Sequence, residues 1–335
     1  MRADELLHPT PAGLYCPPGD FHIDPVRPVA RALITHGHAD HARQGHGAVM
    51  ATAETLAIMA ARHGPDHAAS TQAIGYGETA DIGAVRVSFH PAGHVLGSAQ
   101  IAVTGAGTRI VATGDYKRDA DPTCADFEPV PCDVLITEAT FALPVFSHPP
   151  VRREISRLLD SVKLFNDRTH LVGAYSLGKA QRVIALLREA GYERPIYIHG
   201  ALEAICALYE HSGIALGPLK PVREAQDRLA GELVIAPPAS LADLWSRRFA
   251  DPVTCFASGW MRIRARARQR GVELPLVISD HADWTDLCRT IEESGCGELW
   301  VTHGQEDALV HWAETRGLAA RPLRLVGYDE SEIEE

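Results

Sequence analysis

The chain has 335 residues, of which 46% are hydrophobic and 22% charged, with a formal net charge of -11. This length allows two compact units or one domain with a large insertion. No apolar run approaches the roughly 18 residues that a membrane span needs, and the polar first residues lack the apolar region of a signal peptide. The seven scattered cysteines form no Cys-x-x-Cys pair, which is typical of reduced thiols. We therefore expect a cytoplasmic protein with no membrane partner.

The charge is divided unevenly along the chain. Residues 144–272 carry 19 Lys and Arg against 12 Asp and Glu, a balance of +7, whereas the remainder carries -18. Alternate residues from Arg262 to Arg270 are arginines, which gives one positive edge if the segment is extended and a broad positive surface if it is helical. Phosphate binding needs clustered Lys and Arg, so Arg262, Arg264 and Arg266 are candidate substrate contacts. A solvated charged face is the alternative.

Short β-branched apolar runs that end in His, Asp or Glu recur along the chain. We interpret each as a buried strand and expect the strands to deliver their polar residues to one edge of a sheet. The six runs lie at 29–41, 85–94, 108–115, 133–141, 274–284 and 299–307. Helical patterns, several of which end at Gly, lie at 52–64, 151–165, 177–191, 201–213 and 283–295.

The basic segment has its own alternation of helices with strands at 170–175, 195–200 and 232–237. This alternation predicts a small α/β unit, at residues 144–272, inserted into a first domain. The first domain then comprises residues 1–143 and 273–335. Strands that end in candidate ligands occur on both sides of the segment, which favours an insertion over two domains in tandem.

The sequence from His36 to His41 holds four potential metal ligands within six residues, His36, His38, Asp40 and His41. Neutral imidazoles and carboxylates are preferred donors for zinc and similar divalent ions. Four donors around the flexible Gly37 can reach two adjacent ions. In the alternative, a polar surface loop, four packed donors directly after a buried run would repel one another or stay unsatisfied.

Two further donors follow predicted strands. His94 lies between Gly93 and Gly97, which allow close approach of the backbone, and Asp115 offers two oxygens that can bridge two ions. Each residue alone is typical of a turn or a cap. Together with the first cluster they predict a binuclear metal site.

Several motifs carry a resemblance to a known superfamily. H-x-H-x-D-H, G-H-x-x-G-S-A and T-G-D resemble the metallo-β-lactamase superfamily, and TEATFA, YSLGKAQR, SDHADW and VTHGQ resemble its nucleic-acid-processing β-CASP branch. LYCPPGDFHIDP and the GWM segment are most similar to the bacterial ligase-associated DNA damage response exonucleases. The resemblance covers essentially the whole chain. It implies an α/β fold, a metallo-β-lactamase αββα sandwich with an inserted α/β β-CASP cap.

The resemblance implies two ligand sets that share one carboxylate. These are His36, His38, His94 and Asp115 for one ion, and Asp40, His41, Asp115 and His303 for the other. Asp24 matches a motif that supports the histidine cluster by fixing the imidazole tautomers, and Glu138 and His281 match the later acidic and histidine motifs of the branch. The donor types suit two divalent ions, zinc foremost, with manganese or iron as alternatives.

These residues predict a two-metal hydroxide mechanism for phosphodiester hydrolysis. Two ions lower the pKa of a shared water and hold the phosphate oxygens, and Asp40 orients the attacking hydroxide. His281 then protonates the departing oxygen while Glu138 holds its imidazole. In the alternative, His281 is a further structural ligand or a surface histidine.

The run from Gly173 to Ala180 resembles a Walker A loop because it follows a strand and opens a helix. Ala180 lacks the hydroxyl that holds magnesium, so we do not expect ATP hydrolysis. Backbone N–H groups at the helix start, with Ser176 and Lys179, are candidates for holding a phosphate of the substrate strand. A helix start with an exposed lysine is the alternative.

We expect a metal-dependent exonuclease that acts on single-stranded or ended DNA in repair. The resemblance alone implies a DNA ligase and a helicase as partners. An RNA-processing nuclease is the first alternative, because RNA-cleaving relatives also have a histidine at the position of His303. A glyoxalase or lactonase-type hydrolase shares the metal fold but needs no basic insertion. A non-catalytic DNA-binding subunit is the weakest alternative, because the donor set is complete.

Overall fold

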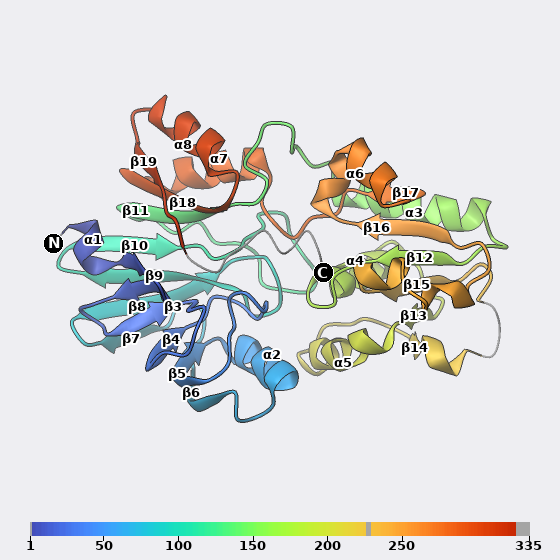
Figure 1. The fold of residues 1–335 in the computed structure, drawn as a ribbon, viewed down its shortest axis with the longest axis horizontal. Coiled ribbons are helices and arrows are strands. Elements are labelled where there is room, and N and C mark those ends of the chain that lie inside the picture. Colours follow the sequence, from blue (N-terminus) through green and yellow to red (C-terminus); the bar gives the residue numbers. More distant parts are fainter. Residues whose placement is uncertain (1, 226–228, 326–335) are drawn as a thin grey trace. The chain divides into compact units, whose positions relative to one another are not determined.

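The computed structural model describes residues 2–225 and 229–325. Within them the protein is mixed α/β with three sheets. It divides into two compact units, one of residues 2–147 and 281–325 and the other of 148–225 and 229–280 (Figure 1). Residues 326–335, which the predicted first domain includes, lie outside the described residues. No helix in the described ranges is long and apolar enough to cross a membrane.

The first unit begins with a six-stranded sheet that follows the chain order. Its first three strands form an antiparallel meander, and the pairs from the third strand to the sixth are parallel. The strands are β1 (His8–Thr10), β2 (Gly13–Cys16), β3 (Phe21–Ile23), β4 (Arg31–Leu33), β5 (His46–Ala51) and β6 (Ala68–Ala73). The short α1 (Ala3–Leu6) precedes β1, and α2 (Ala53–His63) connects β5 to β6.

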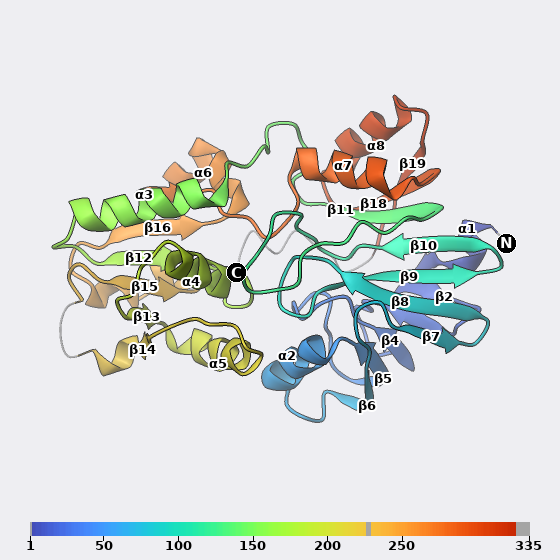
Figure 2. The ribbon, with the colours of Figure 1, turned by 180° about the vertical axis from the view of Figure 1, so that it is seen from behind.

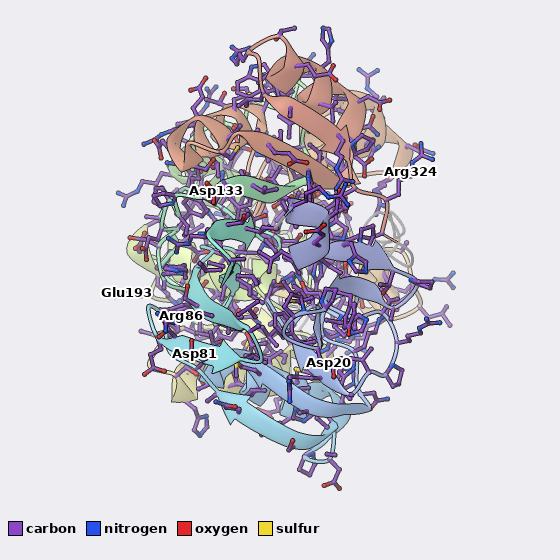
Figure 3. The ribbon with its side chains drawn as sticks, turned by 90° about the vertical axis from the view of Figure 1, so that its left-hand side faces the viewer. Asp20, Asp81, Arg86, Asp133, Glu193 and Arg324 are labelled. Carbon is purple, nitrogen blue, oxygen red and sulfur yellow. The ribbon has the colours of Figure 1, made fainter. Side chains whose placement is uncertain are left out.

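The second sheet of this unit has the order β19-β18-β11-β10-β9-β8-β7. Its strands are β7 (Thr79–Ile82), β8 (Val85–Pro91), β9 (Ala99–Gly105), β10 (Thr108–Ala112), β11 (Val134–Ala139), β18 (Glu298–Gly304) and β19 (Ala319–Pro322). At the edge, Asp81 of β7 pairs with Arg86 of β8 at 2.8 Å, and both side chains are exposed (Figure 3). Such charges discourage pairing of an edge strand with another chain.

The two sheets of the first unit pack on one shared apolar core. Leu33 and Met50 of the first sheet and Val87, Ile101 and Trp300 of the second belong to this core. Alternate residues of the strands face the opposite side, where α2 packs on the first sheet. Helices α7 (Trp284–Ser294) and α8 (Glu306–Glu314) pack on the outer face of the second sheet (Figure 2). Loops at the strand ends are left to carry the polar clusters.

The second unit is built on a six-stranded sheet in which every neighbouring pair is parallel. Its order is β14 (Leu219–Pro221), β13 (Ile196–Ile198), β15 (Leu233–Ala236), β12 (His170–Gly173), β16 (Val253–Ala257) and β17 (Leu274–Leu276). The unit also contains α3 (Val151–Leu164), α4 (Lys179–Glu189), α5 (Glu203–His211) and α6 (Arg264–Gln269). Its central strands are buried along their whole length, as parallel sheets require.

Each of the predicted helices and strands has a counterpart in the structure, but the prediction that six strands meet at one sheet edge is wrong. Strand β4 belongs to the first sheet, β8, β10, β11 and β18 belong to the second, and β17 belongs to the sheet of the other unit. A local apolar pattern encodes a buried strand but not the sheet that the strand joins. The assignment of residues 144–272 as a cap stays a prediction.

Replacing Ile101, in the middle of β9, with Ala tests the shared core. Its side chain is fully buried, and the cavity should lower the free energy of unfolding by about 2–5 kcal/mol, measured by urea denaturation. Thr104→Ala on the exposed side of the same strand is the matched control and should change it by less than about 0.5 kcal/mol. Equal stability of the two variants would contradict the core described here.

Candidate metal centre

The predicted ligands of the first unit lie at or just after the ends of strands from both of its sheets. The segment from His36 to His41 follows β4, His94 follows β8 and Asp115 follows β10. His303 lies near the end of β18. The histidine segment therefore comes from the first sheet, and the other donors come from the second.

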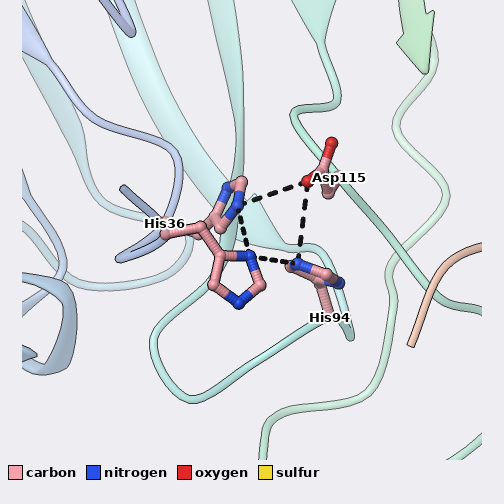
Figure 4. A group of neighbouring side chains, drawn as sticks. His36, His94 and Asp115 are labelled. Atoms are coloured by element: carbon pink, nitrogen blue, oxygen red, sulfur yellow. Dashed lines mark hydrogen bonds and ion pairs between the residues drawn. The ribbon is translucent and has the colours of Figure 1, made fainter. Parts of the chain in front are cut away.

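Four of these donors converge on one point. His36 Nε2 lies 3.1 Å from His38 Nδ1, which lies 3.0 Å from His94 Nε2. Asp115 Oδ2 lies 3.4 Å from His36 Nε2 and 3.7 Å from His94 Nε2 (Figure 4). One ligand atom from each of the four residues lies within 4.8 Å of all the others. Converging lone pairs repel one another unless a cation lies between them, so the group fits a divalent ion.

A second group shares the carboxylate of Asp115. His41, Asp115 and His303 place one ligand atom each within 4.8 Å of one another. His41 Nε2 lies 3.5 Å from Asp115 Oδ2 and 3.5 Å from Asp40 Oδ2. Asp115 thus faces both groups, and a carboxylate in that position can bridge two ions.

The buried Asp24, directly after β3, orients two of the histidines. Its Oδ2 accepts hydrogen bonds from His41 Nδ1 at 2.8 Å and from Thr35 Oγ1 at 2.6 Å, and its Oδ1 accepts from the Thr35 N–H. Since the Thr35 hydroxyl donates to Asp24, it accepts from His36 Nδ1 at 3.0 Å. Nε2 is therefore the nitrogen that both histidines direct to Asp115, and it is the ligand atom of each ring when the ring is neutral. Thr35 was not among the predicted site residues, and its one signal in the sequence is its position directly before His36.

The carboxylates around His41 create a strongly negative field. Burial lowers the pKa of His41, but the charges of Asp40, Asp115 and Asp24 outweigh it and raise the pKa to about 10. Burial lowers the pKa of His36 well below its ordinary value, and the neighbouring histidines add to this. A cluster of carboxylates that stabilises positive charge on His41, next to the neutral imidazole of His36, is the electrostatic environment that attracts divalent cations.

Backbone strain is concentrated at two of these residues. Asp24 has φ 43° and His303 has φ 55°, in the left-handed region that side chains other than glycine rarely adopt. His303 lies at a bulge where Glu138 pairs with Thr302 but Ala139 pairs with Gly304. A bulge re-aims the side chain of the extra residue, which here turns His303 to the group of His41 and Asp115.

Two glycines allow the close approach that the ligand loops need. A Cβ on Gly93 would lie 2.2 Å from the carbonyl oxygen of Lys117, and one on Gly114 would lie 2.7 Å from the Thr35 side chain. Both residues have positive φ values, 72° and 56°. Glycine next to His94 and next to Asp115 therefore lets the two loops pack on their neighbours.

His281 belongs to the same unit and lies beside the first group. Its Nδ1 lies 2.9 Å from Glu138 Oε2, and its ring centre lies 4.7 Å from that of His94. Glu138 Oε1 accepts the Tyr116 N–H at 2.8 Å, so both oxygens of this buried carboxylate have partners. With Nδ1 directed to Glu138, Nε2 is the nitrogen that can exchange a proton with another group.

Comparisons with known proteins agree with the motifs. The chain is 30% identical over 321 residues to a "Probable DNA ligase" of Opitutus terrae. The aligned residues make up 92% of this chain and 30% of that protein. It is 35% identical over 148 residues to "Endoribonuclease YSH1" of Gibberella zeae, 41% of this chain and 18% of the relative. A relative of the same name from Saccharomyces cerevisiae is 32% identical over 123 residues, 35% of this chain and 15% of the relative. No family model matches the chain.

These relatives, and the convergence of the motif histidines, decide the family. The chain belongs to the β-CASP branch of the metallo-β-lactamase superfamily. It spans about a third or less of the length of the curated relatives that it matches. A crystal structure of a protein of unknown function from Enterococcus faecalis V583 is similar in fold, with a TM-score of 0.55 at 11% identity over 81% of this chain and 74% of that chain.

The start of α4 in this β-CASP protein differs from the phosphate loop considered above. The N–H groups of Gly178, Lys179 and Ala180 already donate to Gln181 Oε1, Leu177 O and Tyr175 O. Lys179 is not exposed, because it is buried and its Nζ bonds Asp280. The predicted phosphate role of Lys179 therefore gains no support from this geometry, since its ammonium and these N–H groups are used within the protein. The predicted role of Ser176 stays a prediction.

The predicted basic surface is helical in part. Arg264 begins α6 and Arg266 lies within it, while Arg262 ends the 3₁₀ turn before it. Arg262 and Arg264 are exposed. Arg266 stacks on Trp260 with its guanidinium 4.0 Å from the ring centre, and this contact orders the side chain.

Asp24→Asn tests the orienting carboxylate of the metallo-β-lactamase centre. An asparagine Nδ2 cannot accept hydrogen bonds from Thr35 and His41, so we expect zinc affinity to fall about 10- to 100-fold, measured by competition with a chromophoric chelator. Asp20→Asn is the matched control, because Asp20 also has a positive φ but its side chain accepts a hydrogen bond from the Tyr15 hydroxyl, which is not part of the histidine cluster. Unchanged zinc affinity in Asp24→Asn would contradict the assigned role.

Proposed function

We propose that this chain is a metal-dependent nuclease that hydrolyses phosphodiester bonds of DNA as an exonuclease. The observation that carries the proposal is the convergence of the donors of His36, His38, His94 and Asp115 within 4.8 Å. The proposed architecture is an αββα sandwich with residues 144–272 as a β-CASP cap. The two sheets with a shared core and outer helices support the first part of that architecture.

We propose that the centre holds two divalent ions, most simply zinc. His36, His38, His94 and Asp115 would hold one, and Asp40, His41, Asp115 and His303 the other. Two ions at such a centre supply an acidic water and neutralise charge on the phosphate. The buried carboxylates that raise the pKa of His41 support this assignment, because the same field stabilises added positive charge.

The residues around the ligands have separate roles in the proposed reaction. Asp40, partly exposed, accepts a hydrogen bond from the attacking water and orients it. His281 Nε2 donates a proton to the departing ester oxygen, and Glu138 holds the ring through Nδ1 at 2.9 Å. A carboxylate partner stabilises the protonated imidazole, which a proton donor requires.

DNA is the favoured substrate because the relative named a DNA ligase aligns with a larger share of this chain than the endoribonucleases do. The protein called a DNA ligase matches over 92% of this chain, whereas the endoribonucleases match over 35% to 53%. RNA is the second candidate, since those relatives are endoribonucleases by name and His303 is present. The exposed Arg262 and Arg264 and the stacked Arg266 support contact with a nucleic-acid backbone.

A ligase and a helicase are the proposed partners of the protein. DNA repair in the cytoplasm is its proposed setting.

Labelled substrates test the function. Zinc-loaded and manganese-loaded protein is incubated with single-stranded DNA and RNA, labelled separately at the 5′ and 3′ ends, and with a panel of thioesters. We expect a ladder of products that shortens stepwise from one end of DNA, and no cleavage after chelation. Thioester turnover without phosphodiester cleavage would contradict the nuclease proposal, and preferential cleavage of RNA would favour the second candidate.

His281→Ala tests the proposed proton donor. We expect bound metal per chain to stay unchanged while turnover of an unactivated DNA substrate falls about 10²- to 10⁴-fold, measured by metal analysis and steady-state kinetics. His211→Ala is the matched control, because His211 is exposed and bonds a carbonyl of its own helix. Loss of stoichiometric metal from His281→Ala would show that His281 is a ligand instead.

A further inference from the structure

Asp280, the residue directly before His281, forms a buried ion pair. Lys179, the first residue of α4, bonds Asp280 through its Nζ, and both side chains are less than a tenth exposed. The two residues are 101 positions apart, so tertiary folding alone brings them together. Burying two charges is costly unless they compensate each other, so each partner restricts where the other can lie.

The chain on the Asp280 side is anchored within the second unit. The Val277 N–H donates to Glu154 Oε2 of α3 at 2.8 Å, and Arg157 donates to the carbonyl of Pro275 at 3.2 Å. Ile278 is fully buried. The bond from the Lys179 ammonium to Asp280 is the last of these contacts, because Asp280 is the last residue of the unit in this stretch.

The chain on the His281 side is anchored within the first unit. His281 bonds Glu138, the Ala282 N–H donates to the Tyr116 carbonyl at 2.7 Å, and the Trp284 N–H donates to the Phe146 carbonyl at 3.1 Å. The boundary between the two units thus falls at the peptide bond between Asp280 and His281. His281 is therefore joined by one peptide bond to a residue whose side chain is held by Lys179.

We propose that Lys179 and Asp280 are positioning residues that hold His281 in the orientation its proton transfer needs. The inference rests on the proposed function. A proton donor must lie within hydrogen-bond reach of the departing oxygen, and a displacement of 1 Å can cost about 100-fold in rate. The ion pair therefore acts on the reaction through His281, without contact with the substrate.

The chemistry of the leaving group separates this role from substrate binding. A 4-nitrophenyl ester of a nucleotide expels a stable anion that needs no proton, whereas a DNA strand expels an alkoxide that does. For Lys179→Met we expect kcat on DNA to fall about 10- to 100-fold, with KM and bound zinc unchanged and turnover of the nitrophenyl ester within about threefold. Asp280→Asn, which keeps the shape of the side chain, should show the same selectivity.

Double variants distinguish an effect through His281 from a nonspecific loss of structure or stability. If Lys179 acts through His281, adding Lys179→Met to His281→Ala causes no further loss on DNA, because the effects of two residues that act through one group are not additive. Arg168→Met is the matched control. Arg168 forms another ion pair of this unit, with Glu273 at 2.8 Å, and lies before β12 rather than after it. Its loss should lower stability without the leaving-group selectivity.

A spectroscopic readout needs no turnover. The ¹⁵N ring signals of His281 in zinc-loaded protein, assigned by their absence in His281→Ala, should shift in Lys179→Met and stay unchanged in Arg168→Met. Unmoved signals, equal losses on both substrates, or an added loss in the His281→Ala background would each overturn the proposal. A wild-type protein that cleaves no phosphodiester would contradict the proposed function instead, and the ring signals would still decide the role of the ion pair.

Discussion

The candidate metal centre depends on the hydrogen bonds of one carboxylate, that of Asp24. It joins the end of β3 to the segment after β4 through the N–H and the hydroxyl of Thr35 and the ring of His41. Because Thr35 also orients His36 through its hydroxyl, one buried carboxylate decides which nitrogen two histidines direct to Asp115. The left-handed backbone of Asp24 is a local strain that these hydrogen bonds stabilise.

Asp115 joins the two sheets at the same place. It follows β10 of the second sheet, yet its Oδ2 lies 3.4 to 3.5 Å from the histidines 36 and 41, which follow the first sheet. The apolar core between the sheets fixes the distance between these strand ends, since packed side chains resist displacement. The candidate centre therefore depends on the packing of the two sheets as much as on its donors.

His281 lies beside this candidate centre and at the boundary between the two units of the chain. It comes directly after the second unit, and its neighbour Asp280 is held by the first residue of α4. The bulge in β18 and the bond between Glu138 and His281 add contributions from β11 and β18. Residues from separate stretches of the first unit thus meet around one proposed reaction site, which is how precise geometry is obtained from rigid strands with short loops.

The sequence by itself determined the helices and strands that its apolar patterns predict, the donor cluster from His36 to His41, and the candidacy of His94 and Asp115, because apolar periodicity and ligand chemistry are local properties. The candidacy of His281 came from the resemblance of its motif to those of the β-CASP branch. Only the tertiary structure decided that β17 lies in a different sheet from β18, that Thr35 relays the orientation of His36, and that Lys179 faces Asp280 rather than solvent. Sheet membership and buried pairing depend on contacts between residues far apart in the chain. A linear pattern contains the residues of such contacts but not their distances.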